Sequence, residues 1–181
     1  MRLKYLLIVS LLSLCALSVK GQSFALRTSG VLWATLTPNV EMSYVINEHI
    51  TAHLPLQYNP FVFGDNSRIQ QLTCMPGARY WFKLAHARYF VSAYAIASRF
   101  HVGGWFDHDY RYDGKCFGVG VGGGYSWILN KYFNIEAELG VGTAYANYDK
   151  CYWPKNSKLF SHEKGFRVFP AKFDVSLVYF F

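Results

Sequence analysis

Residues 172–181 read Lys-Phe-Asp-Val-Ser-Leu-Val-Tyr-Phe-Phe, and this stretch decides the fold. Apolar side chains occupy every second position: Phe173, Val175, Leu177, Tyr179 and Phe181. A period of two predicts a β-strand with one apolar face. A strand of about nine or ten residues in this pattern is long enough to cross a membrane at a tilt.

The same period of two recurs upstream, most clearly over residues 133–143, 117–127 and 40–46. One face of each stretch is apolar, and the other is charged or very small. A soluble barrel turns its apolar face inward, whereas a small membrane barrel turns it toward lipid. We therefore expect an all-β protein, an eight-stranded antiparallel up-and-down transmembrane β-barrel. Its strands are predicted over residues 23–35, 40–46, 50–60, 68–82, 87–102, 115–129, 132–147 and 168–181.

Short turns and long loops alternate along the chain. Tight turns are predicted at Asn47-Glu48, Leu84-Ala85-His86 and Asn130-Lys131. Longer connections are predicted near Thr37-Pro38, near Asp65-Asn66, from Trp105 to Asp113 and from Lys150 to Arg167. Outer-membrane barrels have short turns on the periplasmic side and long loops outside. We therefore expect both ends of the barrel domain, and a girdle of aromatic side chains, on the short-turn side.

The first 21 residues are predicted to be a cleaved signal peptide. Arg2 and Lys4 precede an apolar run from Tyr5 to Val19, which is too short for a spanning helix. Cleavage after Gly21 would leave residues 22–181 as the barrel domain and lower the formal net charge from +7 to +4. This mild charge does not indicate nucleic-acid binding. A composition that is 52% hydrophobic and 19% aromatic excludes intrinsic disorder.

The polar faces of the predicted strands gather ionisable side chains inside the barrel. Eight strands enclose an interior just wide enough for side chains to fill, and buried charges need partners. We therefore expect an ion-pair network rather than a catalytic site, with no cofactor and no metal ion. In an open lumen, Glu136 and Glu138 could instead form an acid/base pair, because they share a face. The predicted network contains Arg27, Glu41, Arg79, Glu136, Glu138, Lys172 and Asp174, with His53 on the same face.

Two further motifs have structural interpretations. Gly118, Gly120 and Gly123 match the spacing of a dinucleotide-binding loop, but no helix is predicted to follow them. We interpret these glycines as space for long side chains from neighbouring strands. Cys116 and Cys151 are predicted on adjacent strands, where an oxidising envelope would allow a disulfide. The alternative, three unpaired cysteines acting as apolar fillers, is equally open.

A series of short motifs follows the chain in order: Ala25-Leu26-Arg27-Thr28, Thr37-Pro38-Asn39, Tyr58-Asn59-Pro60, Arg79-Tyr80-Trp81-Phe82, Val102-Gly103-Gly104, Trp127-Ile128-Leu129, Glu136-Ala137, Gly140-Val141-Gly142 and Tyr145 to Lys150. These motifs resemble a family of small Bacteroidota proteins filed as a domain of unknown function. The resemblance implies an outer-membrane barrel and, because members are often encoded near fimbrial subunits, a role in surface appendages. It implies no activity. Members tend to have an acidic residue at the position of Gly77 and a polar one at Met75, so Arg79 lacks a partner on its own strand.

Two surface features indicate how such a barrel would meet its surroundings. The alternating C-terminal residues Phe173, Val175, Leu177, Tyr179 and Phe181 resemble the signal that the outer-membrane assembly machinery reads. The predicted loop from Lys150 to Arg167 is basic, and cations near an anionic surface are attracted to it. We expect this loop to contact lipopolysaccharide through Lys150, Lys155, Lys158, Lys164 and Arg167. The alternative, a solvated loop that its lysines keep soluble, is equally open.

The pattern as a whole favours a non-enzymatic protein of the outer membrane of a Gram-negative bacterium. Its predicted role is structural or one of surface interaction, with fimbrial or other surface proteins as partners implied by the resemblance. Two alternatives remain at this point: a lipid-modifying barrel enzyme that acts on lipid A, and a soluble lipocalin-like carrier.

Overall fold

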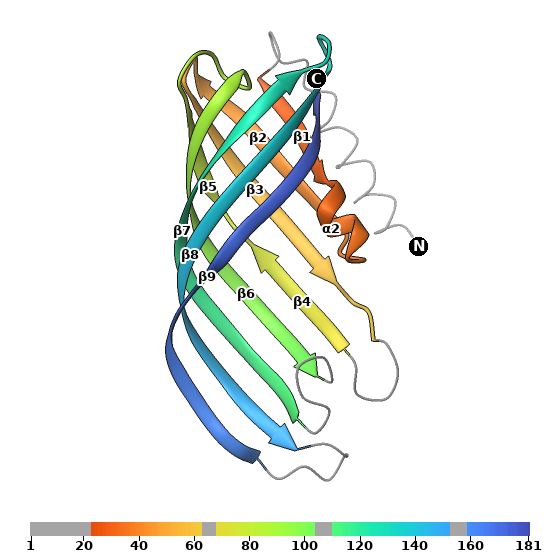
Figure 1. The fold of residues 1–181 in the computed structure, drawn as a ribbon, viewed down its shortest axis with the longest axis vertical. Helices are drawn as coiled ribbons and strands as arrows, with labels where there is room; N and C mark the ends of the chain where they lie inside the picture. The colour runs from red at the N-terminus through yellow and green to blue at the C-terminus, as the bar shows by residue number, and fades with distance from the viewer. Residues whose placement is uncertain (1–22, 63–67, 104–109, 153–158) are drawn as a thin grey trace, which may run out of the picture.

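A computed structural model describes residues 23–62, 68–103, 110–152 and 159–181 (Figure 1). The predicted signal peptide lies outside these residues. Within them, the one α-helix, α2, spans Gly30–Ala34, and no helix is long and apolar enough to cross a membrane. The strands are β1 Phe24–Ser29, β2 Asn39–Asn47, β3 Ile50–Asn59, β4 Arg68–Cys74, β5 Gly77–Trp81, β6 Arg88–Gly103, β7 Tyr110–Ile128, β8 Phe133–Tyr152 and β9 Leu159–Phe180.

The strands form one closed antiparallel sheet. β4 and β5 lie end to end between β3 and β6, so together they occupy one place in the barrel. The break between them falls at Met75-Pro76, where proline cannot donate a ladder hydrogen bond. β1 pairs with both β2 and β9, and this pairing closes the sheet. The predicted all-β, eight-stranded antiparallel barrel is therefore confirmed.

The first predicted strand, residues 23–35, is shorter than expected. β1 ends at Ser29, whose hydroxyl accepts a hydrogen bond from the backbone N–H of Leu32 and caps α2. The Asn39 side chain accepts from the backbone N–H of Ser29 at 2.7 Å and holds the two sides of this connection together. In place of a long strand, a single helical turn therefore stands beside β9.

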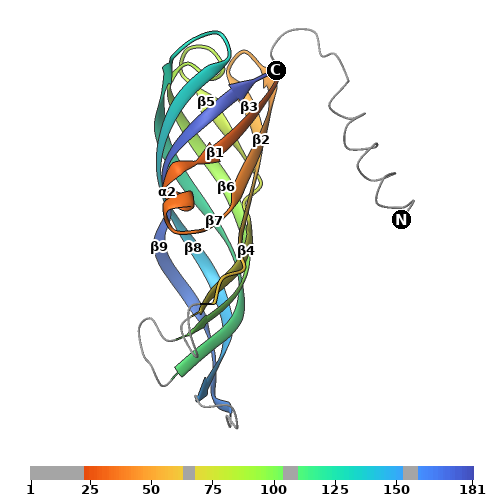
Figure 2. The ribbon, with the colours of Figure 1, turned by 90° about the vertical axis from the view of Figure 1, so that its right-hand side faces the viewer.

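The predicted loop from Lys150 to Arg167 is mostly strand. β8 continues to Tyr152 and β9 begins at Leu159, so both run far past the β1–β2 hairpin (Figures 1 and 2). The extension is held by cross-strand side chains as well as by its backbone. The Tyr148 hydroxyl donates to Glu163 at 2.6 Å, and this hydrogen bond raises the pKa of Tyr148. A strand segment held by polar pairs has no alternation of apolar residues, so its sequence pattern does not predict a strand there.

The short turns gather at one end of the barrel, together with the C-terminus. They connect β2 to β3, β5 to β6 and β7 to β8. The backbone N–H of Phe180 donates to the carbonyl of Tyr132, in the turn before β8. Aromatic pairs surround this end, among them Phe24 with Tyr44 and Tyr125 with Trp127. The predicted short turns and the predicted aromatic girdle are therefore found together at one end of the barrel.

The two faces of the barrel have opposite polarity. Side chains that face inward are buried and mostly polar or charged. The outer face is covered by exposed apolar side chains. Examples on β2, β7, β8 and β9 are Val40, Met42, Tyr44, Phe117, Val119, Val121, Leu139, Val141, Phe173, Val175 and Leu177.

Glycines on β7 and β8 make room for two aromatic side chains inside the barrel. A Cβ at Gly120 would collide with the ring of Tyr94, one at Gly140 with the Tyr94 hydroxyl, and one at Gly124 with the ring of Phe90. The predicted interpretation is confirmed for Gly120, whereas a Cβ at Gly118 would meet Thr143 O and Ala144, and one at Gly123 would meet no side chain. The run is part of β7, and no helix follows it. The dinucleotide motif is coincidental.

Candidate functional site

Seven ionisable side chains meet inside the barrel, between the short turns and α2. Alternation along each strand turns them inward, and the register of neighbouring strands brings them to similar heights. These are the residues that the sequence predicted for the lumen. They come from five strands: Arg27 (β1), Glu41 (β2), Arg79 (β5), Glu136 and Glu138 (β8), and Lys172 and Asp174 (β9).

Arg27 lies at the centre of this network and reaches four carboxylates. Its Nη1 donates to Glu138 Oε2 at 2.9 Å and lies 3.5 Å from oxygens of Glu41 and Glu136. Its Nη2 donates to Asp174 Oδ2 at 2.9 Å. The Arg27 side chain is only 2% exposed. Because water is largely excluded, these charges must compensate one another.

Glu138 is the matching centre on the acidic side. Besides Arg27, its carboxylate accepts from Arg79 Nη2 at 3.0 Å and from Lys172 Nζ at 3.1 Å. The Ser92 hydroxyl donates to it at 2.8 Å. Arg79 also approaches Glu41 to 2.5 Å, so the partners it lacks on its own strand come from β2 and β8.

Aromatic rings support the two outer cations of the network. The Arg79 guanidinium lies 5.3 Å from the centroid of Phe90, and Lys172 Nζ lies 4.7 Å from that of Tyr94. These are the same rings for which the glycines of β7 and β8 make room. The negative face of an aromatic ring attracts a cation, so each ring both fills space and stabilises charge.

Glu136 lies on the short-turn side of the network. Besides Arg27, His86 Nδ1 approaches its carboxylate, at 3.5 Å. His86 lies between Trp81 and Phe180, with ring centroids 5.2 Å and 4.9 Å away. These aromatic rings pack against His86 near the short-turn end of the barrel. Glu136 and Glu138 are both almost completely buried in this interior.

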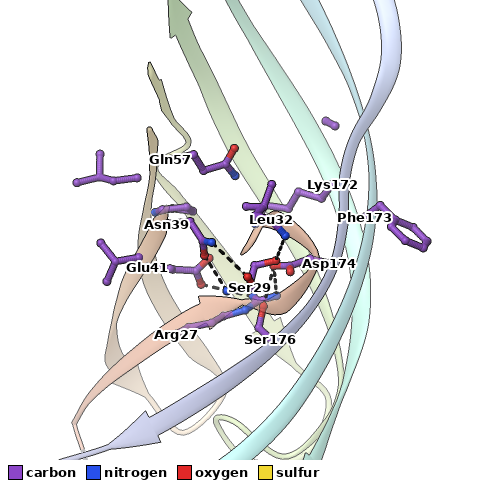
Figure 3. Close-up of a pocket in the computed structure, with 14 residues that line it drawn as sticks. Arg27, Ser29, Leu32, Asn39, Glu41, Gln57, Lys172, Phe173, Asp174 and Ser176 are labelled. Carbon is purple, nitrogen blue, oxygen red and sulfur yellow. Dashed lines mark hydrogen bonds and ion pairs between the residues drawn. The ribbon is translucent and has the colours of Figure 1, made fainter. Parts of the chain in front are cut away.

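A small cavity lies on the long-loop side of the network, where α2 replaces the continuation of β1 (Figure 3). Its volume is about 80 Å³, whereas pockets for small-molecule ligands usually measure about 300–1,000 Å³. It has room for a few water molecules, and its polar walls offer them partners. Its lining includes Arg27, Glu41, Lys172, Asp174, Ser29, Asn39 and Gln57.

His53, which was predicted on the same inner face, is buried on β3. In the described part of the chain, no group of three or more His, Cys, Asp or Glu side chains could hold a metal ion.

The predicted disulfide is wrong. Cys116 lies opposite Ala146, and Cys151 lies opposite Arg111, so the two cysteines are five positions apart along the β7–β8 hairpin. Five strand residues span roughly 17 Å, and a disulfide requires Cα atoms within about 7 Å. Cys74, Cys116 and Cys151 are all free.

The predicted basic loop does not form a single contact surface. Lys150, Lys164 and Arg167 lie on strands, and Lys155 and Lys158 lie outside the described residues. Lys150 Nζ lies 3.7 Å from the ring centroid of Tyr110, on the inner face of the extended sheet. Arg167 is opposite Ala144, which is buried, so it shares that inner face. Lys164 is the only described member of the set that lies on the outer face, because strand alternation separates it from the others.

The five alternating C-terminal residues all face outward. Phe173, Val175, Leu177, Tyr179 and Phe181 are exposed on the outer face, next to the closure between β9 and β1.

Sequence reasoning missed the neutral members of the interior. Ser92 and Ser176 donate to Glu138 and Asp174, and Thr51 accepts from the Trp81 indole at 3.0 Å. One signal could have found Ser92. Phe90, Ser92 and Tyr94 alternate along β6, and the glycines of β7 indicate which face of β6 carries the large side chains.

The comparisons with known proteins bear on the family alone. A search of curated proteins finds no match to this chain. The family model described as "Protein of unknown function (DUF3575)" matches residues 6–181. Because this match spans nearly the whole chain, the protein belongs to the DUF3575 family, whose description assigns no activity.

Proposed function

We propose that the protein is a non-enzymatic β-barrel of the outer membrane of a Gram-negative bacterium, with a structural or surface-interaction role. The observation that carries the proposal is the polarity of the two faces: charges lie inside and apolar side chains lie outside. In water, this arrangement would expose a large apolar surface. In a bilayer, the same surface faces hydrocarbon.

The interior argues for a structural role and against the two alternatives. A lipocalin-like carrier needs an apolar interior, whereas this one holds Arg27, Glu138 and their partners. A lipid-modifying enzyme needs a reactive group that a substrate can reach. Here Glu136 and Glu138 are almost completely buried, and Glu138 is bound by three cations.

The proposal includes the route to the membrane and the partners. Residues 1–21 would be removed as a signal peptide, and the alternating C-terminal residues would be read by the outer-membrane assembly machinery. The long-loop end would then face outward, where lipopolysaccharide surrounds it. The family resemblance adds fimbrial or other surface proteins as partners at that end.

Cysteine labelling on intact cells tests both location and orientation. His162 and Lys131 are exposed at opposite ends, near the long-loop end of β9 and in the short turn before β8. Each is changed to cysteine in a chain whose own cysteines are replaced by serine. A membrane-impermeant maleimide should label His162→Cys on intact cells and Lys131→Cys only after lysis. The opposite pattern would invert the topology, and recovery of the protein in the soluble fraction would refute the membrane location.

A further inference from the structure

The outer face of the extended sheet changes from apolar to charged at one level across four strands. The last apolar positions are directly opposite one another in neighbouring strands: Ala97, Phe117, Tyr145 and Phe166. Phe117 is 63% exposed and Phe166 is 76% exposed. Aromatic residues are typical of the level at which a membrane meets water. This apolar row therefore forms the edge of the apolar band that lies toward the long loops, on this side of the barrel.

The next outward-facing positions form a basic row, which consists of Arg99 on β6, Lys115 on β7, Asn147 on β8 and Lys164 on β9. Arg99 is directly opposite Lys115, Lys115 is opposite Asn147, and Asn147 is opposite Lys164. All four side chains are exposed. Like charges placed opposite each other in a sheet are destabilising unless something compensates them.

No carboxylate of the described residues lies within ion-pair distance of Arg99, Lys115 or Lys164. The following row contains two carboxylates, Asp113 and Asp149, but each pairs with a histidine. Asp113 lies 2.9 Å from His101, and Asp149 is bound by His162. The basic row is therefore left uncompensated, between an aromatic edge and a row of internally paired charges.

We propose that the basic row binds the phosphate groups of lipid headgroups at the outer surface of the membrane. This inference rests on the proposed function, because it needs the apolar band to lie in a bilayer. Neighbouring strands are about 4.8 Å apart, so the row spans roughly 14 Å, wide enough for a headgroup that carries two phosphates. The Arg99 guanidinium can bind phosphate oxygens in pairs, and the two lysines add charge.

The proposal changes the expected contact with lipopolysaccharide. Of the five basic residues predicted for that contact, Lys164 alone belongs to the basic row. Arg99 and Lys115 replace the others, because they share its face and its level. The ligand is thus held by one rigid face of paired strands. The phosphates of the lipid would lie next to the rings of Phe117 and Phe166, on the side toward the long loops.

The test compares two variants with the same loss of charge. The first changes Arg99, Lys115 and Lys164 to glutamine. The matched control changes Lys83, Arg88 and Lys131, three exposed cations at the short-turn end, to glutamine. The full chain is expressed, the folded barrel is purified in a zwitterionic detergent, and binding of fluorescent diphosphorylated lipid A is measured in low salt. The same titration is repeated with dephosphorylated lipid A.

The basic-row variant should bind diphosphorylated lipid A on the order of a hundred-fold more weakly than the unchanged protein. The control variant should bind it as the unchanged protein does, and dephosphorylated lipid A should bind the unchanged and basic-row proteins equally weakly. Full affinity of the basic-row variant would overturn the proposal, as would equal affinity for the dephosphorylated lipid. Displacement by inorganic phosphate as readily as by lipid A would make this a site for free phosphate and would also overturn it.

A separate measurement distinguishes failure of this inference from failure of the proposed function. Both variants and the unchanged protein are mixed with phosphatidylcholine vesicles, and insertion is followed by resistance to protease. Normal insertion with unchanged lipid A binding would refute only the basic row. A chain that does not insert at all would refute the membrane barrel itself.

Discussion

Loss of the Arg79 charge should destabilise the barrel strongly. The Arg79 side chain is 1% exposed, and its guanidinium lies 2.5 Å from Glu41 and 3.0 Å from Glu138. In Arg79→Met, which keeps much of the volume, Glu138 retains Arg27, Lys172 and Ser92. Glu41 retains only the more distant Arg27, at 3.5 Å. Removing one partner of a buried ion pair costs about 3–5 kcal/mol of unfolding free energy, and we expect a loss near 3 kcal/mol here.

A double-mutant cycle identifies the cause of that loss. Glu41→Gln added to Arg79→Met removes the unpaired carboxylate, so the double variant should be more stable than Arg79→Met alone. Unfolding is followed in detergent by tryptophan fluorescence and by the change in gel mobility on heating. A loss below about 0.5 kcal/mol for Arg79→Met, as is usual for surface substitutions, would mean that Arg79 faces water or lipid. Strictly additive losses in the cycle would refute the pairing with Glu41.

Two further predictions concern packing and assembly. Gly120→Ala should destabilise the barrel by about 1–3 kcal/mol in the same assay, because the new Cβ would collide with the buried ring of Tyr94. Gly165→Ala is the control, because its Cβ would meet no neighbour. Equal stability of the two variants would contradict the packing. Deletion of Phe181 should prevent assembly, because it removes the last outward aromatic of the alternating C-terminal stretch; a truncated chain that reaches the outer membrane and migrates as a folded barrel on a cold gel would contradict this role.

Alternation predicted the strands wherever one face is clearly apolar. Along residues 133–143 the inward positions include Glu136 and Glu138, and the outward positions include Leu139 and Val141, so the orientation was unambiguous. Since inward ionisable residues on such strands must find partners, the members of the network also followed from the sequence. The individual pairs did not, because they depend on the register between strands that are distant in the chain.

β6 and α2 show where sequence reasoning fails. β6 is apolar on both faces, with Phe90 and Tyr94 inside and Val91 outside, so its orientation is decided by the glycines of β7. α2 has only five residues, and its start depends on a contact between Ser29 and Asn39. Neither feature has a local periodicity. The extension of β8 and β9 was missed for a related reason, because its outer face becomes charged beyond Phe166.

The short β1 has a consequence for how the barrel closes. β1 pairs with β9 from Ala25 to Ser29, whereas β8 pairs with β9 from Phe133 to Cys151. β1 pairs with β2 over only four positions and with β9 over five, so local opening should begin at β1 and its seam with β9, where least structure must be disrupted. Arg27 spans this seam, because it extends from β1 to Asp174 on β9 and Glu138 on β8. Side-chain charge therefore holds together the two ends of the sheet, and the seam should separate first when salt or denaturant weakens that charge.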